Sequence, residues 1–263
     1  MPHAPRWAPR WLLLLIVGIL GGLLSGVFGV GGGAVMVPLL IWLLGMDQRR
    51  AAATSLVAIV PTAIVGSVAY GFGGHVAIIV GGLVAVGGIG GALIGTRLLR
   101  RVPIGVLRWM FVGLLGLAAV ETLIDIPSRD AEISLTMVSG TILLLVGVLM
   151  GVASGLFGIG GGVIVVPILM GGFGASDLLA KGTSLAAMIP AAITGSAANM
   201  RARLVRVGDG LVVGFAASAA SLLGVVVAYH INPRVSGLLF SVLLTVTMVQ
   251  LAYRAIKLRG VAD

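Results

Sequence analysis

Long apolar segments separated by short polar ones make up nearly the whole chain. Two of these segments are unusually long, at 11–44 and 133–174. Six shorter spans lie between and after them, at 51–70, 76–96, 104–124, 182–199, 209–229 and 235–254. A run of about 20 apolar residues is long enough to cross a bilayer as a helix. The runs are apolar on all sides, whereas the strands of a membrane barrel alternate between apolar and polar residues. The pattern therefore predicts an all-α integral membrane protein.

A cluster of glycines interrupts each of the two longest segments. The clusters are Gly29, Gly31, Gly32 and Gly33 in the first segment, and Gly158, Gly160, Gly161 and Gly162 in the second. Glycine adopts positive φ angles and weakens a helix, so we expect the helix to break at each cluster. Lipid cannot satisfy the backbone groups that a break exposes, so each break must line a cavity or be buried in protein.

The second half of the chain repeats the first at a constant offset of 129 residues. The stretch GLLSGVFGVGGGAVMVP (Gly22–Pro38) returns as GVASGLFGIGGGVIVVP (Gly151–Pro167). Self-similarity over a long period indicates a repeated architecture. We therefore expect a first membrane repeat at 1–124, an extracytoplasmic linker at 125–132 and a second membrane repeat at 133–263.

The basic residues predict how the chain is threaded through the membrane. Cytoplasmic loops carry most of the Lys and Arg residues of membrane proteins. If each glycine-broken segment leaves and returns on one side, both termini are cytoplasmic and only Arg129, Lys181 and Arg234 lie outside. If each broken segment crossed once, the basic loops at 49–50 and 201–206 could not share a side. We therefore expect two inverted repeats of about four to five helical elements each, eight to ten membrane elements in all, in the cell inner (plasma) membrane.

The composition agrees with a membrane protein and excludes several kinds of site. Of the 263 residues, 59% are hydrophobic and 10% charged, against about 25% charged in soluble domains. The net charge of +9 is explained by the cytoplasmic arginines, so we expect no nucleic-acid partner. The absence of cysteine excludes disulfides and thiolate sites. The basic N-terminus resembles a signal peptide, but no small-residue cleavage site follows it, so we expect this segment to be retained.

The glycine breaks are the first candidate binding site. The runs that follow them, Ala34–Leu44 and Val163–Met170, would begin as helices whose free N–H groups and positive dipole ends point into the break. Such helix ends bind anions. The alternative, close packing of helices through small residues, stays open for these glycines.

Hydroxyl groups at matching positions of the two repeats are the second candidate. A hydroxyl can donate a hydrogen bond to an oxyanion without the desolvation cost of a buried cation. The alternative is a bond from the hydroxyl to a carbonyl one turn earlier in its own helix. The candidates are Thr54, Ser55, Thr183 and Ser184, with Ser25, Ser154 and Asn199 as weaker ones. We expect no catalytic residue, metal site or cofactor.

These duplicated motifs resemble those of the sulfite exporter TauE/SafE family of membrane permeases. The resemblance rests on the doubled block small-x-x-Gly-x-Phe-Gly-(Val/Ile)-Gly-Gly-Gly-(x)4-Pro and on the doubled Thr-Ser-Leu, and it covers essentially the whole chain. It implies a permease for small sulfur-containing anions such as sulfite and organosulfonates. Members are usually drawn with eight spans in two halves of four.

The function expected from these features is secondary transport of a small anion by alternating access. A passive anion channel is the alternative, and an integral-membrane enzyme is a weaker one because the spans contain no His/Glu/Asp/Cys constellation. The chain has no Walker-type phosphate loop, so we expect no ATP use by the chain itself. The expected partners are the small anion and the lipid bilayer, with a homodimer left open.

Overall fold

The structure, a computed structural model, describes residues 9–124 and 137–259 and is helical in those ranges. The predicted linker at 125–132 lies outside the described residues. In chain order the elements are α1 (Arg10–Phe28), α2 (Gly33–Leu44), α3 (Gln48–Phe72), α4 (Ile78–Arg101), α5 (Ile104–Ile124), α6 (Met137–Phe157), α7 (Gly162–Pro167), a π-helical turn η1 (Ile168–Gly172), α8 (Asp177–Arg201), α9 (Val207–His230) and α10 (Pro233–Arg259).

Eight of the described helices are long and apolar enough to cross a membrane, and α2 and α7–η1 are shorter apolar pieces. Large apolar side chains cover the outside of the bundle, for example Phe72 with 90% of its surface exposed and Ile78 with 82%. Soluble proteins rarely expose large apolar patches, so this surface suits lipid. The prediction of an all-α, multi-pass membrane protein is confirmed.

Contacts between helix backbones fix the direction of the helices in the first half. Gly18 of α1 lies against Val213 of α9, and Gly26 lies against Ser221, so α1 and α9 are parallel. α3 is also parallel to α9, as two further contacts show: Val57 with Gly210 and Pro61 with Gly214. α1 and α3 therefore run in the same direction, and α2 between them must run back toward the end at which α1 begins.

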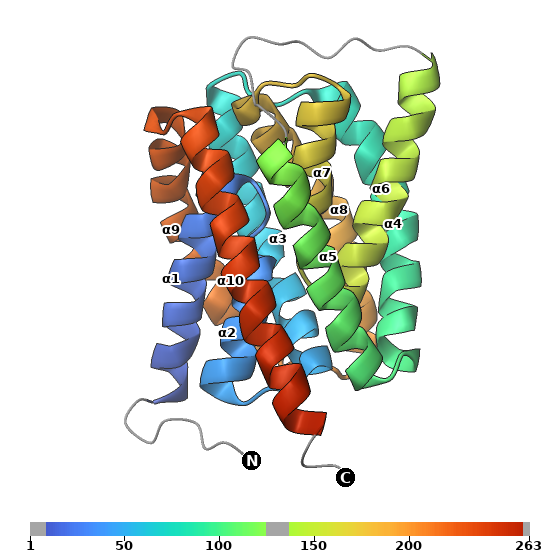
Figure 1. Ribbon diagram of the computed structural model, residues 1–263, viewed down its shortest axis with the longest axis vertical. Coiled ribbons are helices and arrows are strands. Elements are labelled where there is room, and N and C mark those ends of the chain that lie inside the picture. Colours follow the sequence, from blue (N-terminus) through green and yellow to red (C-terminus); the bar gives the residue numbers. More distant parts are fainter. Residues whose placement is uncertain (1–8, 125–136, 260–263) are drawn as a thin grey trace.

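The helices of the second half are arranged in the same way. Gly147 of α6 lies against Val84 of α4, and Gly155 lies against Ala92, so these two helices are parallel. α8 is parallel to α4 through two further contacts, Thr183 with Gly81 and Ala191 with Gly88. The chain must therefore turn back through α7 and η1. In Figure 1, α2 lies in the lower half of the bundle and α7 in the upper half.

Equivalent helices of the two halves run in opposite directions. Gly66 of α3 lies against Leu185 of α8, and Leu56 lies against Gly195, which makes these two helices antiparallel. Since α1 and α9 are parallel to α3, and α4 and α6 are parallel to α8, α1 is also antiparallel to α6 and α4 to α9. Figure 1 shows that α1 begins and α10 ends at the same end of the bundle.

Candidate binding site at the helix breaks

The helix breaks predicted from the glycine clusters are present in both halves. α1 ends at Phe28, and three glycines with φ of 69°, 78° and 75° (Gly29, Gly31 and Gly32) separate it from α2. Gly158, Gly160 and Gly161, with φ of 71°, 80° and 81°, separate α6 from α7. A residue with a Cβ is strained at such angles, so glycine permits these turns. Neither α2 nor α7 has a side chain that caps its N-terminal end.

The two breaks lie against each other in the interior of the bundle. A Cβ atom added to Gly33 would lie 2.2 Å from the carbonyl oxygen of Gly158. One added to Gly162 would lie 2.6 Å from Cα of Val30. Gly160 also lies against the backbone of Val30. The start of each short helix therefore meets the break of the other half, and no side chain at these glycines separates them.

Three of the predicted hydroxyls bind protein atoms. Ser55 donates from Oγ to the carbonyl oxygen of Gly158 at 2.8 Å, which ties α3 to the second break. Oγ1 of Thr183 accepts a hydrogen bond from the backbone N–H of Ala77 at 2.9 Å, just before α4. Thr54 donates to the sulfur of Met46 at 4.0 Å. Only Ser55 among these three contacts a break directly.

Four other predicted residues are fully buried and have polar side-chain atoms without a protein partner. The described residues offer no hydrogen bond to Oγ of Ser25, Ser154 and Ser184 or to either amide atom of Asn199. Tyr70, the equivalent of Asn199 in the first half, donates instead to the carbonyl oxygen of Gly26 at 2.7 Å. Buried polar groups normally have partners, so these atoms are available to water or to a bound solute.

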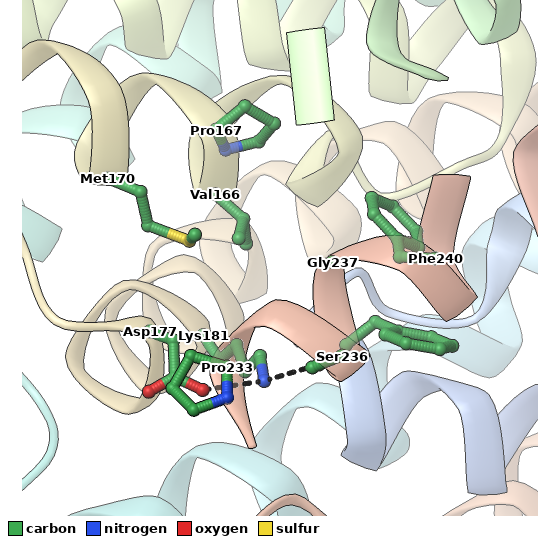
Figure 2. A pocket seen from close by; sticks show the side chains of 10 residues that line it. Val166, Pro167, Met170, Asp177, Lys181, Pro233, Ser236, Gly237 and Phe240 are labelled. Atoms are coloured by element: carbon green, nitrogen blue, oxygen red, sulfur yellow. Dashed lines mark hydrogen bonds and ion pairs between the residues drawn. The ribbon is translucent and has the colours of Figure 1, made fainter. Parts of the chain in front are cut away.

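The structure adds a charged site that the sequence reasoning missed. A cavity of about 30 Å³ lies between α7, η1, α8, α10 and the end of α1. On its wall, Nζ of Lys181 is 3.2 Å from Oδ2 of Asp177 and 3.0 Å from Oγ of Ser236 (Figure 2). The Lys181 and Asp177 side chains are 4% and 1% exposed. Lys181 was expected on the extracytoplasmic side of the membrane, which stays a prediction, and its burial against Ser236 of α10 was not foreseen.

This charged pair lies next to the first break. A Cβ atom added to Gly29 would lie 2.5 Å from Cα of Lys181. Phe28, the last residue of α1, lines the cavity and packs on Phe240 with ring centroids 5.0 Å apart. The break and the cavity thus form one region.

One signal in the sequence could have pointed to the pair. Asp177 and Lys181 are four residues apart, a spacing that places them on the same face of a helix. Their equivalents at the 129-residue offset are Gln48 and Ala52, so the two charges depart from the repeat. Charged residues inside a membrane helix are uncommon and tend to be functional. The described residues contain no group of His, Asp or Glu that could hold a metal ion.

Comparison with known proteins identifies the family. Residues 1–122 and 143–262 match the family described as Sulfite exporter TauE/SafE. The chain belongs to this family. A "Probable membrane transporter protein YdhB" from Bacillus subtilis (strain 168) is 30% identical over 177 residues, which are 65% of this chain and 71% of that protein.

Two proteins of Xylella fastidiosa, from strains 9a5c and Temecula1 / ATCC 700964, are each called "Probable membrane transporter protein". Each is 35% identical over 173 residues, so the match covers 62% of this chain and 64% of each relative. No solved structure matches the chain at a comparable level of significance. The TauE/SafE family and the names of these relatives support a membrane transporter and not an enzyme.

Proposed function

We propose that this TauE/SafE protein is a secondary carrier that moves a small anion, a sulfur oxyanion or an organosulfonate, by alternating access between its two halves. The observation that carries this proposal is the direct contact between the two helix breaks, one from each half. Secondary transporters bind their solutes where discontinuous helices of two repeats meet near the middle of the membrane.

The directions of the helices support an inverted-repeat arrangement across the membrane. Because equivalent helices run antiparallel, the α1–α2 pair enters from one face and the α6–α7 pair from the other. Arg49 in the first turn of α3 and Arg203 and Arg206 in the loop before α9 lie at the end at which α1 begins. The preference of Lys and Arg for the cytoplasmic side supports a cytoplasmic location for that end in a plasma-membrane protein.

The groups near the breaks suit an anion with several oxygens. The first backbone N–H groups of α2 carry the positive end of the helix dipole. The hydroxyls of Ser25, Ser154 and Ser184 are buried and have no partner in the described structure. The family description names sulfite export, and sulfite and sulfonates offer oxygens that accept such hydrogen bonds.

Counterflow in proteoliposomes tests the carrier mechanism. Vesicles containing the purified protein are loaded with unlabelled sulfite, thiosulfate, a sulfonate, sulfate or a carboxylate, and the uptake of labelled anion is followed. We expect an internal sulfur oxyanion or sulfonate to accelerate uptake several-fold, because a carrier returns faster when it is loaded. Uptake that does not depend on the internal anion would indicate a channel and contradict the proposal.

A further inference from the structure

The Asp177–Lys181 pair is poorly explained as a device that stabilises the fold. Both side chains are almost completely buried, at 1% and 4% exposure. Removing two charges from water costs free energy that their mutual attraction often fails to offset, so apolar residues at these positions would serve stability as well or better. A buried ionisable pair in a membrane segment is better explained by function.

The geometry allows the pair to exchange partners. Oδ1 of Asp177 is buried and has no hydrogen-bond partner among the described residues. Lys181 also donates to the neutral hydroxyl of Ser236, which can retain the ammonium group when the carboxylate is neutralised. The adjacent cavity of about 30 Å³ is large enough for water to bring a proton, since one water needs about 10–15 Å³.

We propose that Asp177 and Lys181 form the proton-coupling and anion-anchoring site of the carrier, an inference that rests on the proposed function. While Asp177 is ionised it occupies Lys181 and competes with the solute. A proton that adds to Oδ1 of Asp177 neutralises the carboxylate and breaks the ion pair, and Lys181 then pairs with the anionic group of the solute. The proton adds one positive charge and the solute one negative charge, so the net charge of the site is unchanged.

The groups around Asp177 support its assignment as the proton acceptor. The other described residues that line the cavity are apolar, apart from the hydroxyl of Ser236. Tyr70 of α3 is a titratable group near Asp177, but its neutral hydroxyl donates a hydrogen bond to the Gly26 carbonyl. Tyr229 stacks on Tyr70, and His75 packs against Tyr229 on the side of loop α3–α4.

The lining of the cavity indicates the class of anion. One ammonium group faces apolar walls that include the rings of Phe28 and Phe240 and the side chain of Met170. A monovalent anion with a short carbon chain, such as an alkanesulfonate, fits these surroundings. Sulfate would bring a second charge that the site does not neutralise.

The pH dependence of methanesulfonate binding to the purified, detergent-solubilised protein tests the inference. The sulfonate group stays ionised across the neutral range, so any pH dependence comes from the protein. We expect the affinity, measured by thermal stabilisation, to rise as the pH falls, by about tenfold per pH unit where one proton is bound with each anion. In weakly buffered solution, binding should take up about one proton per anion.

Variants separate the roles of the two residues. Asp177→Asn removes the carboxylate beside Lys181 at every pH, so methanesulfonate binding should become independent of pH and proceed without proton uptake. The double variant Asp177→Gln with Lys181→Ala gives α8 the residues of α3 and should bind methanesulfonate about tenfold to hundredfold more weakly. Gln48→Asn, at the equivalent place in the first half, is the matched control and should keep the pH dependence of the wild type.

Each outcome decides between the two proposals. Binding of methanesulfonate to the wild type without pH dependence or proton uptake would overturn the coupling inference and leave the carrier proposal standing. The same conclusion follows if Asp177→Asn keeps the wild-type pH dependence, or if the double variant keeps full affinity. If Asp177→Asn does not fold, proton uptake by the wild type still decides. If no sulfonate, sulfite or thiosulfate stabilises the protein, the proposed substrate class fails and the inference fails with it.

Discussion

The region around Phe28 and Phe240, which lines the cavity, corresponds to the region around Phe157 and Phe111, and the two regions share the same frame of packed helices and rings. Phe28 packs on Phe240 with ring centroids 5.0 Å apart, and Phe157 packs on Phe111 with centroids 5.3 Å apart. Phe28 and Phe157 are equivalent at the 129-residue offset, as are Phe111 and Phe240. In each half, the last residue of a broken helix therefore packs on the final long helix of the other half.

The residues inside that frame differ between the two halves. The charged pair and hydroxyl of the second half (Asp177, Lys181 and Ser236) are replaced in the first half by Gln48, Ala52 and Leu107. Leu107 is fully buried, and the buried amide of Gln48 has no partner among the described residues. The frame thus agrees with the duplication, whereas the charges occur on one side only. Coupling to protons, if it uses these charges, belongs to the second half alone.

Removing the cation of the second half should have the largest effect on stability. Lys181→Ala leaves Asp177 buried without its partner, and breaking a buried pair in this way costs about 3–5 kcal/mol. The measurement is the free energy of unfolding in detergent, from denaturant titration followed by tryptophan fluorescence.

The double variant Asp177→Gln with Lys181→Ala is the control for this loss. It gives the second half the residues that the first half already has, so it should recover most of the lost stability while binding the anion poorly. If Lys181→Ala alone were as stable as the wild type, this would show that Asp177 is not held as an ion in the folded protein.

Equivalent glycines should show that the frames of the two halves are energetically alike. A Cβ atom would lie 2.1 Å from the carbonyl oxygen of Ala217 if added to Gly22, and 2.2 Å from that of Gly88 if added to Gly151. Since backbone cannot easily move away, Gly22→Ala and Gly151→Ala should each cost about 1–3 kcal/mol in the free energy of unfolding.

Gly90 supplies the contrast, because a Cβ atom added there meets nothing within 4 Å. Gly90→Ala should be neutral or stabilising by about 0.4–1 kcal/mol. A large cost at only one of the two equivalent glycines would contradict the shared frame.

The fold could be predicted from the sequence because its signals are local and repeated. The glycine clusters predicted the breaks, since a turn with positive φ angles favours glycine. The starts of the helices were less accurate: α8 was expected from residue 182 and begins at Asp177. This start was missed because the polar residues Asp177 and Lys181 interrupt the apolar pattern. Ser176 caps the helix by accepting a hydrogen bond from the backbone N–H of Leu179.

The candidate site could be predicted only in part because its chemistry depends on tertiary contacts. The sequence does not show that Thr183 binds the backbone of Ala77 on another helix. It also does not show that α10 brings Ser236 over Lys181. The breaks and their hydroxyls were predicted as binding groups, and that role remains a prediction. The buried ion pair was missed because a charged residue near a helix start is usually assigned to the surface.

The smallest effects should come from the two serines at equivalent positions, Ser55 and Ser184. Ser55 donates to the carbonyl oxygen of Gly158 at 2.8 Å, so Ser55→Ala should lower the free energy of unfolding by about 1 kcal/mol. Ser184 has no partner among the described residues, so Ser184→Ala should change stability by less than Ser55→Ala does. If its hydroxyl instead binds the solute, the KM for counterflow should rise about fivefold, which corresponds to one neutral hydrogen bond of about 1 kcal/mol. The initial rates of labelled-anion uptake at several concentrations measure this change. A loss of stability equal to that of Ser55→Ala with an unchanged KM would mean that Ser184 stabilises the fold, and the candidate site would then lose one of its proposed donors.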